Sequence, residues 1–303
     1  MIFTKPSVEL INQEDLYKHI ELCGRTCYHS QDKITNDSAK KFVDTLIKSN
    51  HLSVLEHGTI YLSLDMTSRD RYFKYCYNKY SKTCSIGSAN EGTWEGFVTT
   101  NLRVLIENGW MEDLQYISEP TKHPRRITVR FTCGIDISRE INRHRCNSVS
   151  EQSTRYCNYS LGKFENSIHV ITNEDINDDS ISSCLTSWDP EDSDQQYILE
   201  TMCYGIYNDR TSHWDVIDTW LFANLAAEWS YMKLISLGWK PQQARRILPL
   251  DTETELIHTA FLSDWEHFLA LRSPKHGATG VHPDAAYLAN ELKDLLNEYV
   301  KHL

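Results

Sequence analysis

The chain has 303 residues, of which 40% are hydrophobic and 24% charged, values ordinary for a globular protein that buries a core. Its net charge of −11 is concentrated between Glu165 and Asp209, where eleven acidic residues occur without a lysine or arginine, so the rest of the chain is neutral. This distribution argues against nucleic-acid binding through bulk positive charge, and any anion site must come from local clusters of basic residues.

The nine cysteines are scattered without a CxxC pair, and no HExxH motif occurs. This pattern indicates reduced thiols, and neither a disulfide framework nor a zinc site is expected. The N-terminal residues lack the apolar run of a signal peptide, and no stretch approaches the ~20 apolar residues of a membrane span. We therefore expect a cytoplasmic protein without a bound metal, a membrane partner or a nucleic-acid partner.

The N-terminal part of the chain is predicted to contain two helices and a strand. Apolar residues recur at helical spacing over 12–28 and again from Ser38 to Ile47, where Asp37 and Ser38 form the expected cap. Residues 59–65 alternate between apolar and polar, as in a half-buried strand.

A histidine-rich segment, His51–His57, follows the second predicted helix. Loops just past helices commonly carry ligand contacts. Its two histidines and Glu56 could bind a metal, but we prefer the interpretation that His57 is structural and pairs with Glu56 or with the backbone.

Residues 66–125 are predicted to be mainly helical, with one helix over 68–80 and a second from Trp94 that Gly109 ends, separated by a Ser/Gly/Asn-rich loop. Residues 126–135 alternate again and predict a second strand, paired with the first. A short helix over 136–144 is expected to follow this strand.

The C-terminal half is predicted to be mostly helical after a short strand at 168–171. An acidic connector at about 172–196 is expected to be an exposed loop. Further helices are expected from apolar spacing and from Gly and Pro boundaries, at 214–237, from Pro241, at 254–271 and at 283–301. We therefore predict an α+β fold, with a mixed or antiparallel sheet flanked by helices.

The most informative stretch runs from Arg143 to Tyr156 and contains three arginines, a histidine and a glutamate. The arginine fork matches phosphate and carboxylate, and crowded like charges favour an anion between them. We interpret the stretch as a site for a phosphorylated ligand, with Glu151 as the acceptor for a ligand N–H; a solvated basic turn is the alternative. Glu151, Ser153 and Arg155 are spaced by two and would share one face of an extended chain.

These residues resemble the signature RHRxxSxxEQSxRY of the flavin-dependent thymidylate synthases. The segment His51–His57, residues 238–249 and residues 267–272 resemble three further blocks of that family. The resemblance implies the fold of that family in a single domain over 1–303, with 66–125 as an insertion relative to compact members. It also implies a homo-oligomer, a homotetramer, with sites shared between protomers, which fits the lack of a GxGxxG motif.

The resemblance also assigns roles. Arg272 and His51 would be catalytic. FAD would meet a set of residues from three of the blocks: His51, Ser53, Arg143, His144, Arg145, Glu151 and His267. The nucleotide dUMP would meet a second, overlapping set: Glu140, Arg143, Glu151, Gln152, Ser153, Thr154, Arg155, Arg245 and Arg272.

The implied reaction is the reductive methylation of dUMP to dTMP, with 5,10-methylenetetrahydrofolate as carbon donor, FADH2 as hydride donor and NADPH as reductant. None of the nine cysteines lies in a recognisably activated setting, so a guanidinium at the N3/O4 edge would make C5 nucleophilic in place of a thiol adduct.

Three positions depart from the family pattern, and they motivate a binding protein without turnover as an alternative: Cys27 replaces a common Ser, Glu140 a Gln and Phe261 an Asn. A methylase of uridine in RNA is a third reading, disfavoured by the neutral body of the chain.

Overall fold

The computed structural model describes residues 1–301 and has the predicted α+β fold. The chain divides into two units, which are described separately. Unit 1 contains three segments, Met1–Ser7, Thr132–Glu140 and Gln152–Glu255. Unit 2 contains Val8–Phe131, Ile141–Glu151 and the chain from Leu256 onward. None of the described helices is long and apolar enough to cross a membrane.

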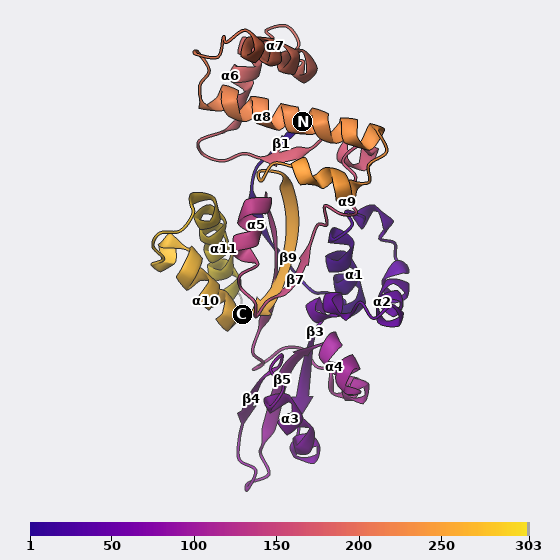
Figure 1. Cartoon of the computed structure of the whole chain (residues 1–303). Helices are drawn as coiled ribbons and strands as arrows, with labels where there is room; N and C mark the ends of the chain where they lie inside the picture. The colour runs from indigo at the N-terminus through magenta and orange to yellow at the C-terminus, as the bar shows by residue number, and fades with distance from the viewer. Residues whose placement is uncertain (302–303) are drawn as a thin grey trace. The chain divides into compact units, whose positions relative to one another are not determined.

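A four-stranded sheet organises unit 2. Its strands are ordered β2 (Ser7–Ile11), β6 (Arg126–Gly134), β9 (Glu253–Phe261) and β7 (Ser148–Glu151), and β7 runs antiparallel to β9. Figure 1 shows α1 (Leu16–Thr26) on one side of these strands, and α10 (Leu262–Arg272) and α11 (Pro283–Lys301) on the other.

Polar side chains are buried on the side of the sheet that faces α1. His19 of α1 lies 3.1 Å from the Thr128 hydroxyl, which lies 2.7 Å from that of Thr259. On the other side of the sheet, Phe131 packs against the Trp265 and Phe268 rings of α10. Thr128 and Phe131, which lie an odd number of residues apart on β6, therefore face opposite sides of the sheet, as strand alternation requires.

Residues 59–116 form a second, three-stranded sheet with helices. Its order is β3 (Thr59–Leu64), β5 (Glu95–Asn101) and β4 (Lys82–Ile86), all antiparallel, together with α3 (Arg69–Cys76) and α4 (Leu102–Asn108). The expected pairing of the first two predicted strands is wrong, because β3 pairs with β5 and β6 lies in the other sheet. The predicted helix from Trp94 is also wrong over β5, whose run of Phe, Val and Thr residues is largely buried. Gly109 does end α4, with a φ of 69° that favours glycine.

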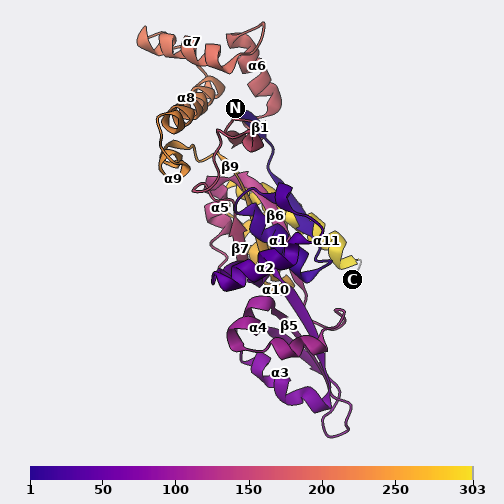
Figure 2. The ribbon, with the colours of Figure 1, turned by 90° about the vertical axis from the view of Figure 1, so that its right-hand side faces the viewer.

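In unit 1, β1 (Ile2–Thr4) pairs in parallel with β8 (His169–Ile171), and the long helix α8 (Val216–Ser236) packs with α6 (Asp178–Trp188) and α7 (Gln195–Tyr207) (Figure 2). The expectation of an exposed loop at 172–196 is wrong for α6. Asn177 caps this helix, and Ile181 and Cys184 are buried one turn apart. Ile181 and Cys184, with the partly buried Leu185 and Trp188, follow helical spacing, but the surrounding acidic residues favoured the loop interpretation.

The other helices are α2 (Ser38–Lys48), α5 (Ile135–Ile141) and the short α9 (Pro241–Ala244). The helix expected over 254–271 is wrong in its first half, which is β9; only α10 is helical. The final helix, α11, has the predicted bounds. The extended run expected at Glu151–Arg155 is also wrong, since β7 ends at Glu151 and Tyr156 N–H donates to the Ser153 carbonyl in a turn.

Asp113 joins α3 to the chain after α4. Its carboxylate is fully buried and accepts from Arg71, from the Tyr75 hydroxyl at 2.6 Å and from Lys74 at 2.6 Å. Burial raises the pKa of Asp113, but hydrogen bonds from Lys74, Tyr75 and Arg71 outweigh this and hold the pKa below its ordinary value. A carboxylate with three donors is therefore the anchor of this region.

We expect Asp113→Asn to lower the free energy of unfolding by roughly 2–4 kcal/mol, because it leaves two cations without their buried counter-ion. Glu112→Gln is the matched control: its carboxylate also contacts Arg71 but is 63% exposed, so its loss should cost less than about 1 kcal/mol. Urea unfolding of both variants measures the difference. Equal losses would contradict the anchoring role of Asp113.

Candidate active site

The arginine-rich segment forms a tight turn between α5 and β7. The His144 N–H donates to the Ile141 carbonyl, and the Asn147 N–H donates to the His144 carbonyl. Arg143 and Arg145 are exposed on this turn. Among residues 1–301, no carboxylate lies within ion-pair distance of either guanidinium. Two cations thus project near the end of α5 without a protein counter-ion, an arrangement that attracts an anionic ligand.

His144 connects this turn to α10. Its ring is half-buried, with the Phe268 ring 4.6 Å away and the His267 ring 6.4 Å away, and Arg272 Nε donates to His144 Nε2 over a long 3.5 Å. Burial, Arg272 and His267 lower the pKa of His144 to about 4, so the ring is a neutral acceptor at pH 7. The structure therefore brings together three predicted site residues: His144, His267 and Arg272.

Glu151 lies at the end of β7, half-exposed. Its Oε2 accepts from Asn142 Nδ2 at 2.9 Å. Asn142 also contacts the fully buried His258 of β9. Neither Asn142 nor His258 was predicted as a site residue. The periodicity of Thr252, Thr254, Leu256, His258 and Ala260 as a strand is the signal that would have put His258 on a sheet face.

The remaining predicted nucleotide residues belong to unit 1. Arg245 is exposed, and its Nη1 donates to the Thr154 hydroxyl at 3.1 Å. Ser153 and Thr154 are half-buried in the turn after β7, and Arg155 is exposed with its guanidinium 5.2 Å from the Tyr156 ring.

Two further residues of that predicted set are Gln152 and Glu140. Gln152 is buried, and its backbone N–H donates to the Glu255 carbonyl at 2.8 Å. Glu140 is half-buried on α5.

His51 and Ser53 line a separate, small cavity of about 300 Å³ together with Arg103 and Glu107. Both are exposed there, at the turn between α2 and the 3-10 helix η2 (Leu52–His57).

His57 is structural, but its expected partners are wrong. The ring is fully buried and lies 2.8 Å from the Thr259 hydroxyl and 3.0 Å from the Ser150 hydroxyl. Glu56 instead pairs with Arg103. The two neighbours thus point to different partners, and within residues 1–301 no group of three His, Cys, Asp or Glu side chains could hold a metal ion.

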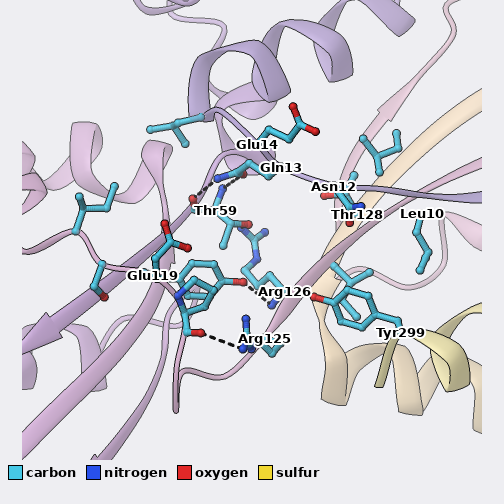
Figure 3. Close-up of a pocket in the computed structure, with 17 residues that line it drawn as sticks. Leu10, Asn12, Gln13, Glu14, Thr59, Glu119, Arg125, Arg126, Thr128 and Tyr299 are labelled. Atoms are coloured by element: carbon cyan, nitrogen blue, oxygen red, sulfur yellow. Dashed lines mark hydrogen bonds between the residues drawn. The ribbon is translucent and has the colours of Figure 1, made fainter. Parts of the chain in front are cut away.

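A larger cavity, of about 470 Å³, is lined by none of the predicted site residues (Figure 3). Gln13, Tyr61, Arg125, Arg126 and Tyr299 are among the residues around it. Arg126 is buried and donates to neutral oxygens of η2, β3 and β7: the Glu56 carbonyl and the Thr59 and Ser148 hydroxyls. Burial lowers the pKa of Arg126 to about 10. Its role is to tie β6 to its neighbours.

The structure shows the contacts of two residues that depart from the family pattern, Phe261 and Cys27. Phe261 is buried, with the Lys82 ammonium 4.5 Å and the Arg126 guanidinium 5.6 Å from its ring. Cys27 bonds to the Ser150 side chain and to the Glu151 backbone, while burial raises the pKa of its thiol. Cys27 therefore packs under β7, the strand that carries Glu151.

The model of one protein family, the thymidylate synthase complementing protein, matches residues 9–74 and 72–299. The chain belongs to the thymidylate synthase complementing protein family. The resemblance drawn from the arginine signature is thereby confirmed, and membership of this family associates the chain with thymidylate synthesis. The division into one domain with an insertion stays a prediction, as do the individual roles of the site residues.

Two solved structures are similar to this member of the thymidylate synthase complementing protein family. Both are of the UMP/dUMP methylase PolB from Streptomyces cacaoi. The one bound with 5-Br dUMP has 16% identity and a TM-score of 0.41, and the match covers 98% of this chain and 93% of that chain. The one bound with 5-Br UMP has 14% identity, a TM-score of 0.40, and coverages of 98% and 92%. No curated protein matches the sequence.

The buried histidines predict an acid-sensitive fold. Burial lowers the pKa of His258 to about 3 and that of His19 to about 4, from an ordinary value of 6.5. The unfolded chain therefore binds protons first, so the stability is complete above about pH 6.5 and falls as the pH drops toward these folded-state pKa values.

We expect the slope of unfolding free energy against pH, between about pH 6 and 4, to be smaller in His258→Gln than in the wild type by about 1.4 kcal/mol per pH unit. The glutamine retains a donor and an acceptor but does not titrate. Chemical denaturation at several pH values measures both slopes. Equal slopes would mean that His258 is not held neutral in the folded state.

Proposed function

We propose that the chain is an FAD-dependent thymidylate synthase that converts dUMP to dTMP, with 5,10-methylenetetrahydrofolate as carbon donor and NADPH as reductant of the flavin. The observation that carries the proposal is the arginine turn of a family member. It has two exposed arginines that no carboxylate of residues 1–301 pairs with, a neutral histidine, and a carboxylate hydrogen-bonded to Asn142. The resemblance further supports a cytoplasmic homotetramer in which protomers share the sites.

The donor set of the turn fits a diphosphate-bearing cofactor. Arg143 and Arg145 are the cations that would hold the anionic part of FAD, and Glu151 offers an acceptor for a ligand N–H. His144 and His267, with Ser53 and His51 from the other cavity, complete the predicted flavin set. Reduced flavin, when bound, supplies the hydride of the reaction, whereas the protein binds, orients and polarises.

Arg272 is the residue that we expect to activate the pyrimidine. Arg272 is half-buried at the end of α10, and the His144 ring that accepts a hydrogen bond from its Nε is uncharged. A fixed guanidinium against the N3/O4 edge would stabilise negative charge there and so raise the electron density at C5. Arg245, with Thr154 and Ser153, is suited to the nucleotide phosphate.

The decisive experiment is an anaerobic assay of the purified chain with dUMP, methylenetetrahydrofolate, FAD and NADPH. The proposal expects dTMP and oxidation of NADPH that depends on both dUMP and the folate. Flavin bound without any dTMP would instead support the binding-protein alternative, and product formed on uridine in RNA but not on dUMP would support the third reading.

Arg272→Ala should lower the rate of dTMP formation by roughly 100-fold or more, since a transition-state electrostatic contact is worth several kcal/mol. Bound flavin should keep its absorbance. Arg139→Ala removes an exposed arginine of α5 and is the charge-matched control. Turnover within about twofold of the wild type in Arg272→Ala would refute the role of this arginine.

Cysteine substitution separates electrostatic from thiol activation. None of the nine cysteines, all of which lie within residues 1–301, forms a disulfide. Cys146 is the exposed thiol inside the signature, whereas burial raises the pKa of Cys23. We expect Cys146→Ser to retain dTMP synthesis within about threefold, because a guanidinium and not a sulfur adduct activates the ring. If a well-folded Cys146→Ser, or a variant lacking all nine cysteines, made no dTMP, a thiol nucleophile would be required.

A further inference from the structure

The arginine turn is closed by a buried histidine from another strand. His258 lies on β9 with no exposed surface, its ring 6.1 Å from Phe131 and 6.4 Å from Trp265. Its Nε2 lies 3.1 Å from Asn142 Oδ1, and its Nδ1 lies 3.1 Å from Asn147 Nδ2. Asn142 and Asn147 are the residues immediately before and after Arg143–Cys146. One imidazole therefore holds both ends of the loop that carries the two exposed arginines.

The hydrogen bonds that link Glu151, Asn142, His258 and Asn147 allow one consistent assignment of donors and acceptors. A carboxylate only accepts, so the Asn142 amide nitrogen donates to Glu151 Oε2 at 2.9 Å, and the Asn142 oxygen must then face His258. His258 Nε2–H donates to that oxygen. In a neutral ring the other nitrogen is an acceptor, and it takes the N–H of Asn147. Both contacts of His258 pair a donor with an acceptor only when the ring is neutral with its proton on Nε2.

We propose that His258 is a positioning residue that clasps the arginine turn and, through Asn142, fixes the carboxylate of Glu151. This inference rests on the proposed function, because Arg143, Arg145 and Glu151 are the ligand-binding groups there. The hydrogen bond from Asn142 to Oε2 of Glu151 holds this carboxylate in one orientation relative to the turn. The clasp therefore supplies orientation, and it touches no ligand itself.

The hydrogen bonds of His258 matter because, without them, the turn would lose conformational entropy when a ligand binds, and this loss weakens binding. The three predicted ligand groups would then lose both alignment and preorganisation. Removing the imidazole deprives the half-buried Asn142 oxygen and the buried Asn147 amide of this partner, which costs free energy unless the turn rearranges toward water. Both consequences predict a looser turn and weaker binding.

The test compares His258→Leu, which fills the site without hydrogen bonds, with His258→Gln, which keeps one donor and one acceptor. His19→Leu is the matched control, since His19 is also a buried neutral histidine of unit 2 but bonds to Thr128 on the α1 side of the sheet. For each variant, hydrogen exchange of the backbone amides of 142–148 and the dissociation constants of FAD and dUMP are measured below the unfolding transition.

His258→Leu should raise amide exchange across 142–148 and weaken binding of FAD and dUMP by about tenfold or more. His258→Gln should restore most of both, and His19→Leu should change neither. Unchanged exchange in His258→Leu would overturn the clasp, and faster exchange with unchanged dissociation constants would overturn its role in ligand binding. If the wild type bound neither ligand, the proposed function would fail, while the exchange data would still decide whether His258 holds the turn.

Discussion

Polar side chains that a strand removes from water must find partners inside the protein, and this constraint determines the centre of unit 2. On β9, His258 and Thr259 are neighbours in sequence but face opposite sides of the sheet, and both are fully buried. Thr259 bonds to His57 and Thr128, whereas His258 bonds to Asn142 and Asn147. An unsatisfied buried group costs about 1–3 kcal/mol, so each of these bonds restricts the chain to one arrangement.

The same constraint explains how cations can be held exposed at a turn. Arg143 and Arg145 need no counter-ion to fold because they face water. The turn that carries them is held by hydrogen bonds among uncharged side chains. Neutrality is favoured by burial, which lowers the pKa of both His258 and His144. A charged imidazole at either position would repel the arginines. The uncharged histidines therefore fix the geometry of the turn, and the positive charge of Arg143 and Arg145 can attract an anionic ligand.

Much of the framework could be predicted from periodicity. The alternation in β3 and β6 and the long stripe of α11 are local signals, and the structure has all three. The arginine signature also identified the family, but the helix expected over 136–144 ends at Ile141, so Arg143 and His144 lie on a turn. Where residues 254–271 were expected to form one helix, however, the apolar residues fit either period, and the sequence alone did not separate β9 from α10. That error concealed His258.

The partners of individual side chains were the other limit. His57 was expected to pair with its neighbour Glu56, but its bonds reach Thr259, which is distant in the chain, and Glu56 turns to Arg103. The expected row of Glu151, Ser153 and Arg155 failed because β7 ends at Glu151. Local spacing predicts a face only while the element continues, and long-range hydrogen bonds leave no periodic trace.

The central claim is that the arginine turn, held from behind by uncharged groups, binds the anionic parts of the ligands. An experimental structure of the chain with FAD and dUMP bound tests it most directly. The account predicts that the Arg143 and Arg145 guanidiniums lie within hydrogen-bond distance of ligand phosphate oxygens while His258 keeps both asparagines. Ligands bound with these two arginines facing bulk solvent would contradict it.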